Sequence, residues 1–257
     1  MPFPTPRCVQ SFGLLLLAVA PALSQPADTN AFAARAAQAF MDAQKDFALR
    51  GGEASAAWHL GRASYDWAEF ATNADQRATV ARVGIAACQQ LITRDPKSAP
   101  GHYYLGMDLG ELAEAEAPSV AAYHLIREIE REFKAAVDLD DSFDYGGPLR
   151  CLGLLYRDAP GWPISIGSKR KARDYLERAA EVAPDFPENQ MNLVESHVQW
   201  HEAAEAESAW KKLTALWPRA STKLVGVAWQ PSWTDWTARR TAVRADFERT
   251  FKKNLVP

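Results

Sequence analysis

The chain has 257 residues, of which 47% are hydrophobic and 24% are charged, and its formal net charge is −3. This length suits one sizeable core or a short array of repeats. No long run of basic residues is present, which argues against a nucleic-acid-binding surface. Nine Trp and seven Tyr residues supply apolar side chains that keep one polar atom for recognition.

The first 24 residues have the pattern of a secretory signal peptide. Arg7 precedes an apolar run at 12–20 that is short for a bilayer span, and small residues precede the expected cleavage before Gln25. Cys8 lies before this run, which disfavours a lipoprotein. We therefore predict an exported, periplasmic protein with no stable membrane span after cleavage. An uncleaved anchor that tethers the chain is the alternative.

A helix–loop–helix pattern occupies 145–189. Its first helix has large residues and one glycine at fixed spacing, and its second has small residues followed by a proline. These positions are Leu149, Leu152, Gly153 and Tyr156, then Ala172, Leu176, Ala179 and Pro184. This spacing is typical of a tetratricopeptide (TPR) repeat, in which the glycine allows two helices to approach closely.

The same pattern fits three more places in the chain, at Leu60-Gly61, Leu105-Gly106 and Leu193-Val194. The expected corners between units are Pro96, Asp141, Pro184 and Pro218. We therefore predict an all-α fold, a TPR-like helical-hairpin solenoid of about four units with capping helices. A non-repeating helical bundle is the alternative.

The predicted domains follow from this frame. They are a signal peptide at 1–24, a leader and capping helix at 25–52, four units at 53–96, 97–141, 142–184 and 185–218, and an irregular segment with a final capping helix at 219–257. The remaining cysteines, Cys88 and Cys151, fall in different units, so we expect no bond between them.

One helix of each TPR unit faces a concave groove. In this alignment of the repeats, the groove residues are mostly aromatic or apolar, and two of them are arginines. A residue of the loop between two helices could close over the groove. The predicted ligand-binding residues are Trp58, Arg62, Tyr65, Tyr103, Met107, Arg150, Leu154, Trp162 and Met191, with Glu195 at a further groove position. Such a groove suits an apolar ligand with an anionic head, or an extended peptide. Alternatively these residues pack on the next repeat, and the loop around Trp162 covers the seam between its two helices.

Other chemistry has little support. His197 and His201 share a helix face, but the order His-x-x-x-His-Glu lacks the internal Glu of a metalloprotease. No nucleophile elbow, phosphate loop or nucleotide fingerprint is present, so we predict no enzyme, no metal and no cofactor. The groove also lacks the Lys and Asn pattern that clamps a terminal carboxylate.

The export signal and the segment Tyr145-Gly-Gly-Pro-Leu-Arg, followed by Ala-Pro-Gly-Trp-Pro, give the chain a family resemblance. Over about 57–217 it resembles the T-component of tripartite ATP-independent periplasmic (TRAP) transporters, although it has no lipobox. This resemblance implies a helical periplasmic protein that associates with the substrate-binding component and holds a small hydrophobic or carboxylated ligand. The alternative is a pure protein–protein interaction adaptor for envelope assembly without a small ligand.

Overall fold

The computed structural model describes residues 27–255, so the predicted signal peptide lies outside the described residues. This part of the chain contains ten α-helices and one short 3₁₀ helix, which confirms the predicted all-α fold. None of its helices is both long and apolar enough to cross a membrane. The helices form two compact units, here called the N-terminal unit (α1 to α5) and the C-terminal unit (α6 to α10).

The N-terminal unit is built from one leading helix and two helical pairs. Its helices are α1 (Ala27–Arg50), α2 (Ala54–Ala68), α3 (Ala74–Arg94), α4 (Ala99–Glu116) and α5 (Val120–Leu139). Helix α1 packs on α2, α2 packs on both α3 and α4, and α4 packs on α5. Cys88 of α3 is a free, buried thiol.

The C-terminal unit continues the hairpin pattern and ends in a longer helix. Its helices are α6 (Phe143–Asp158), α7 (Lys169–Val182), α8 (Pro187–Gln199), α9 (Ala203–Lys223), the 3₁₀ helix η1 (Val227–Trp229) and α10 (Gln230–Phe251). Helix α8 packs on α7, α9 and α10. Phe186, Trp229 and Trp236 form an aromatic cluster that includes Leu216 and Ala220 of α9.

Helix starts are set by polar residues that precede them. The side chains of Asn73, Ser98, Ser119 and Ser168 each accept a hydrogen bond from the backbone N–H three residues later. Each such cap stabilises a helix by about 1 kcal/mol.

The predicted corner at Pro218 is wrong. Helix α9 runs through Pro218 to Lys223, and α10 already begins at Gln230. Pro218 removes one backbone donor, but the buried residues Leu216 and Ala220 continue the helical spacing across it and reach the aromatic cluster. The irregular segment expected at 220–235 is therefore reduced to a few residues around η1.

The second pair, which falls in the predicted unit at 97–141, has only a short connection between its two helices. Helix α4 extends to Glu116, and α5 starts at Val120 after the Ser119 cap. The extra length of this unit over a standard TPR repeat lies in longer helices.

We predict that Gly153→Ala lowers the free energy of unfolding by about 1–3 kcal/mol, because a Cβ there has no room. It would lie 2.7 Å from Leu176 Cγ and 3.2 Å from the Leu176 backbone nitrogen. Urea unfolding followed by circular dichroism measures the change. The control is Gly161→Ala, whose Cβ would come no nearer than 3.8 Å to another atom. Equal stability of the two variants would contradict the close approach of α6 and α7.

Candidate functional site

The predicted groove residues of the N-terminal unit lie on α2 and α4. Trp58 is half-buried, and its ring stacks on Tyr104 with ring centres 5.8 Å apart. Tyr65, Tyr103 and Met107 are fully buried. They therefore contribute to the packing of α2 against α4, and as ligand contacts they stay a prediction.

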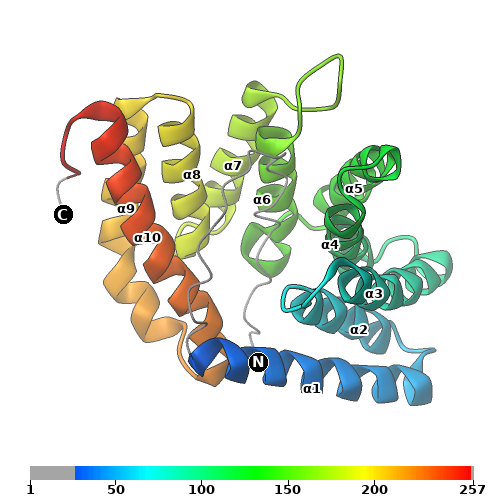
Figure 1. Ribbon diagram of the computed structural model, residues 1–257. Coiled ribbons are helices and arrows are strands. Elements are labelled where there is room, and N and C mark those ends of the chain that lie inside the picture. Colours follow the sequence, from blue (N-terminus) through cyan, green and yellow to red (C-terminus); the bar gives the residue numbers. More distant parts are fainter. Residues whose placement is uncertain (1–26, 256–257) are drawn as a thin grey trace. The chain divides into compact units, whose positions relative to one another are not determined.

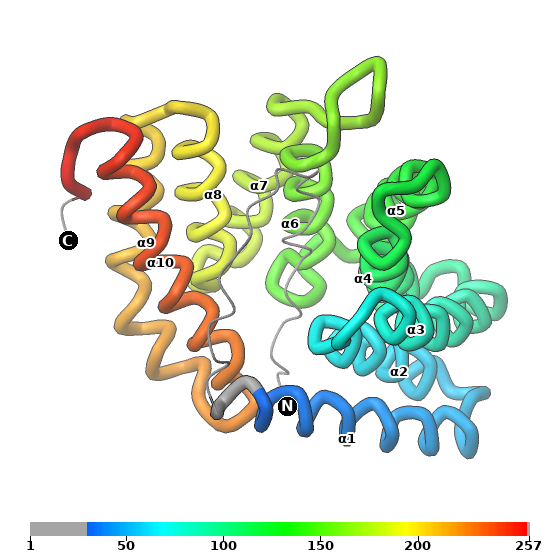
Figure 2. The backbone as a smooth tube through the Cα atoms, in the orientation of Figure 1, coloured from blue at the N-terminus to red at the C-terminus, as the bar shows by residue number. Residues whose placement is uncertain are grey.

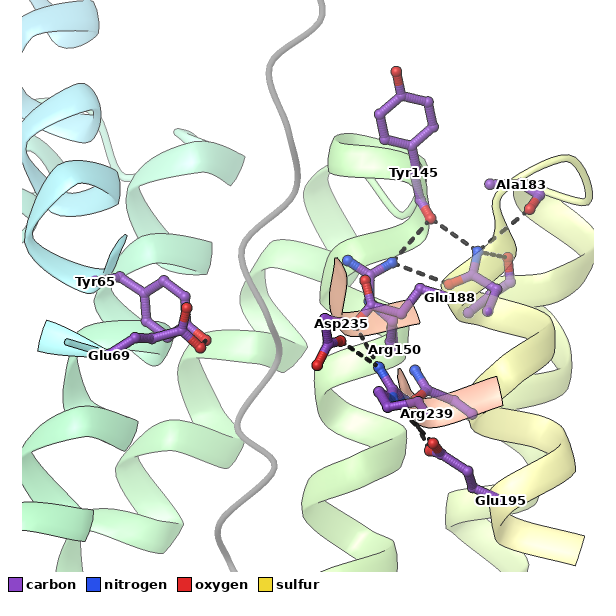
Figure 3. A network of polar contacts seen from close by, with 12 residues as sticks. Tyr65, Glu69, Tyr145, Arg150, Ala183, Glu188, Glu195, Asp235 and Arg239 are labelled. Carbon is purple, nitrogen blue, oxygen red and sulfur yellow. Dashed lines mark hydrogen bonds and ion pairs between the residues drawn. The ribbon is translucent and has the colours of Figure 1, made fainter. Parts of the chain in front are cut away.

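Polar contacts accompany this packing. The Tyr65 hydroxyl donates a hydrogen bond of 3.1 Å to Glu69, as Figure 3 shows. The Arg62 guanidinium lies 3.6 Å from the Asp66 carboxylate, one turn further along α2. An acid thus lies next to the guanidinium that the sequence assigned to an anionic ligand.

Helix α4 carries two buried carboxyl groups, those of Asp108 and Glu111. Burial raises the pKa of Glu111 to about 7, although Arg77, 2.6 Å away, opposes the shift. Burial also raises the pKa of Asp108 well above its usual range, and the nearby Glu111 and Asp66 add to this. Neither acid was identified from the sequence, since helix periodicity alone does not distinguish a buried acid from an exposed one.

The predicted groove residues of the C-terminal unit lie on α6 and α8, and Leu154 and Met191 are buried there. Arg150 is fully buried and engaged within the unit. It donates hydrogen bonds of 3.0 Å to the Asn189 side chain and 3.3 Å to the Tyr145 carbonyl. Its guanidinium also lies over the Phe186 ring, 5.2 Å from the ring centre. These contacts make Arg150 a structural link between α6 and α8.

Asn189 extends this link to α7. Its amide nitrogen donates to the carbonyl oxygens of Tyr145 at 3.0 Å, Ala179 at 2.9 Å and Ala183 at 3.3 Å. The Tyr145 carbonyl reaches both Arg150 and Asn189 from a left-handed turn at the start of α6. Sequence reasoning missed Asn189, because its partners are backbone atoms that no residue pattern identifies.

Arg239 of α10 forms a second buried network on α8 (Figure 3). Two of its nitrogens bind the Glu195 carboxylate at 2.7 and 2.8 Å, and Nη1 lies 3.5 Å from both Glu188 and Asp235. Burial opposes the charge, but Glu195, Glu188 and Asp235 outweigh it and raise the pKa of Arg239. Glu195, predicted to face a groove, therefore holds the last helix on α8.

The loop at 158–167 joins α6 to α7, and Figure 2 shows it extending from the ends of these helices. The Gly167 N–H donates to the Pro160 carbonyl at 2.9 Å, and the Ser168 N–H donates to the Tyr156 carbonyl at 2.8 Å. Trp162 is nevertheless 89% exposed, and Ile164 is 71% exposed. Backbone hydrogen bonds therefore hold the loop, but the alternative in which the loop around Trp162 covers a helix seam is wrong, because Trp162 and Ile164 are exposed.

The two histidines that the sequence suggested as a pair, His197 and His201, lie in different environments. His197 is buried and shares a hydrogen bond of 2.8 Å with Glu202. His201 is exposed in a left-handed turn after α8. The Glu202 carboxylate is also bound by Lys169 and Arg173, which tie α7 to the start of α9.

We expect Arg239→Met to lower the free energy of unfolding by about 3–5 kcal/mol, because it removes the buried cation that binds Glu195 and lies beside Glu188 and Asp235. Differential scanning calorimetry measures the change. Arg249→Met on the same helix is the matched control, since Arg249 is 73% exposed and pairs only with Asp246. A loss below about 1 kcal/mol for Arg239→Met would show that this network does not hold α10.

The raised pKa of Glu111 makes stability depend on pH. Between the ordinary value of 4.5 and about 7, the folded chain keeps a proton that the unfolded chain releases. The free energy of unfolding therefore falls as pH rises through this window, by up to about 3 kcal/mol. Glu111→Gln should reduce this fall when urea unfolding is repeated from pH 4.5 to 8, and the buried Asp108, whose pKa is also raised, accounts for the part that remains. Glu116→Gln, at a more exposed position, should retain it. Parallel curves for wild type and Glu111→Gln would contradict the argument.

Comparison with known proteins supports the fold. No family model and no curated protein matches the chain. A solved thermophilic TPR protein of Thermus thermophilus, TTC0263, superposes with a TM-score of 0.59 at 15% identity, covering 82% of this chain and 91% of that one. MamA aligns with a TM-score of 0.41 at 18% identity over 72% of this chain and 94% of its own. Yeast Tom70 aligns with a TM-score of 0.31 at 10% identity, covering 88% of this chain and 61% of its own. The first of these similarities, together with the hairpin geometry above, shows that the chain has a TPR-like fold.

Proposed function

We propose that this protein is a non-enzymatic TPR scaffold that binds a protein partner. Stacked helical hairpins form extended surfaces suited to partner binding. The observation that carries the proposal is the exposed Trp162 at the tip of a structured loop. Trp162 is 89% exposed and lies near the exposed Ile164, and Trp side chains are common anchors at protein interfaces.

The loop is suited to this role because its backbone is already fixed. Hydrogen bonds from Gly167 to Pro160 and from Ile164 to Gly161 close it without help from a partner. A binding element that is ordered before association loses less conformational entropy when the complex forms. Trp162 is thus the predicted site residue with the strongest support for partner contact.

The small-ligand alternative has weaker support. It requires Arg62 and Arg150 to bind an anionic group, but Asp66 lies beside Arg62, and Arg150 is fully buried among Asn189, Tyr145 and Phe186. Association with a TRAP substrate-binding component rests on the sequence resemblance around 145–163. The observations therefore favour binding of a protein partner over binding of a small ligand.

We also propose that the scaffold acts in the periplasm. Support comes from the charged, apolar and small-residue regions of the first 24 residues, in the order that export signals require. The partner is then an envelope protein.

Photo-crosslinking from position 164 tests the scaffold function. With benzoylphenylalanine in place of Ile164, cells that express the protein should give one discrete crosslinked complex, whose partner is identified by mass spectrometry. The same residue at Val225, exposed elsewhere, is the control.

The purified partner should then bind Trp162→Ala about 10- to 100-fold more weakly than wild type in calorimetric titrations, because an interface anchor is lost. Leu49→Ala, at an exposed position on α1, should keep wild-type affinity. The absence of any crosslinked protein, or full affinity of Trp162→Ala, would contradict the proposal.

A further inference from the structure

A groove of about 300 Å³ lies within the C-terminal unit, between α7, α8 and α9. We call it the α7–α9 groove. Glu177 and Glu181 line it from α7, and Glu205 and Lys212 line it from α9. Its floor comes from α8 and includes Gln190 and Leu193. The groove belongs to neither the Arg150 network nor the Arg239 network.

The carboxylates of this groove are not used by the fold. Glu177, Glu181 and Glu205 are all exposed, and no ion pair within the described residues involves them. This contrasts with Glu188 and Glu202 of the same unit, each of which pairs with a basic side chain. Lys212 is the one lysine or arginine of the lining, so the groove is negative overall.

The floor of the groove adds an independent indication of a binding site, from the side chain of Gln190. Gln190 is only 5% exposed, and its buried side-chain oxygen accepts no hydrogen bond from the described residues. Such an oxygen is costly to leave unsatisfied inside a folded protein. It needs a donor, and the residue lines the groove from which a donor could arrive.

We propose that the α7–α9 groove binds an arginine side chain of a protein partner. The aliphatic stem packs on Leu193 and the small residues beside it, and the guanidinium donates hydrogen bonds to the Gln190 oxygen and to Glu181 or Glu205. Arginine fits better than lysine, because its planar group offers five donors and can bind an amide oxygen and a carboxylate at the same time. This proposal names a partner chemistry for the scaffold function and rests on it.

The site is tested with a fluorescein-labelled nonapeptide that carries one central arginine between alanine and leucine residues. The matched probe replaces arginine with citrulline, which keeps the shape and removes the charge. Fluorescence anisotropy with the full chain should show saturable binding of the arginine peptide only. Affinity should fall at least 5-fold between 0.05 and 0.3 M salt, since the contact is ionic.

Variants then place the site. Glu181→Gln combined with Glu205→Gln should weaken binding at least 10-fold, and Gln190→Met should weaken it by a smaller factor. Glu207→Gln, exposed on α9 but outside the groove lining, is the matched control and should bind like wild type. Amide shifts in a ¹⁵N NMR titration should change at Leu193 and Ala209, and thermal melts check that each variant is folded.

The proposal is overturned if the citrulline peptide binds equally, if the double variant keeps full affinity, or if the shifts map away from the groove. Saturable binding of calcium chloride that displaces the arginine peptide would also overturn it in favour of a metal site. If the crosslinked partner binds but is indifferent to Glu181 and Glu205, the scaffold function stands and the groove proposal fails. If the peptide binds in the groove but no protein partner is ever crosslinked, the scaffold function fails instead.

Discussion

The fold depends on how closely the two helices of each pair approach one another. At the same position of α2, α4 and α6 a glycine faces a side chain of the following helix. These contacts are Gly61 with Cys88, Gly106 with Phe133 and Gly153 with Leu176. In the last two a Cβ would come within 2.7 Å of a side-chain carbon, so any larger residue forces the helices apart. The fourth pair has Val194 at this position, so the glycine is not repeated in every pair.

The close packing of the helices also determines which polar side chains are buried and which stay exposed. Once α6, α7 and α8 meet, Arg150 and Asn189 are enclosed and take hydrogen-bond partners from within the unit, among them the Tyr145 and Ala179 carbonyls. Glu188 and Glu195 likewise lie against Arg239. A buried charge without a partner destabilises a protein strongly, so these side chains are committed to the fold. The proposed binding features are groups that the fold does not pair internally, namely the exposed tip of the 158–167 loop and the carboxylates of the α7–α9 groove.

The helical pairs could be predicted from the sequence because each close helix contact needs a small residue, and these glycines recur at a regular spacing. The same spacing could not predict the polar networks, since Arg239 and Glu195 are 44 residues apart and belong to different helices. The corner predicted at Pro218 fails for a related reason. The local rule that proline ends a helix was overridden by Leu216 and Ala220, which pack into the aromatic cluster on either side of it. The burial of Arg150 and the exposure of Trp162 both depend on tertiary packing, and neither residue type nor spacing encodes it directly.

The two proposed binding features differ in their physics, and this difference has consequences for specificity. Trp162 offers apolar area, which gives affinity but accepts many apolar surfaces, and salt hardly affects it. The α7–α9 groove instead offers hydrogen bonds with a defined geometry, because a guanidinium there must bind both an amide oxygen and a carboxylate. Charged contacts mainly exclude wrong partners and orient the right one, so a partner that satisfies only one feature binds weakly. Under the proposed function, the chain selects its partner by charge through the unpaired carboxylates of the α7–α9 groove, while acids such as Glu188 and Glu202 pair with basic side chains of the fold.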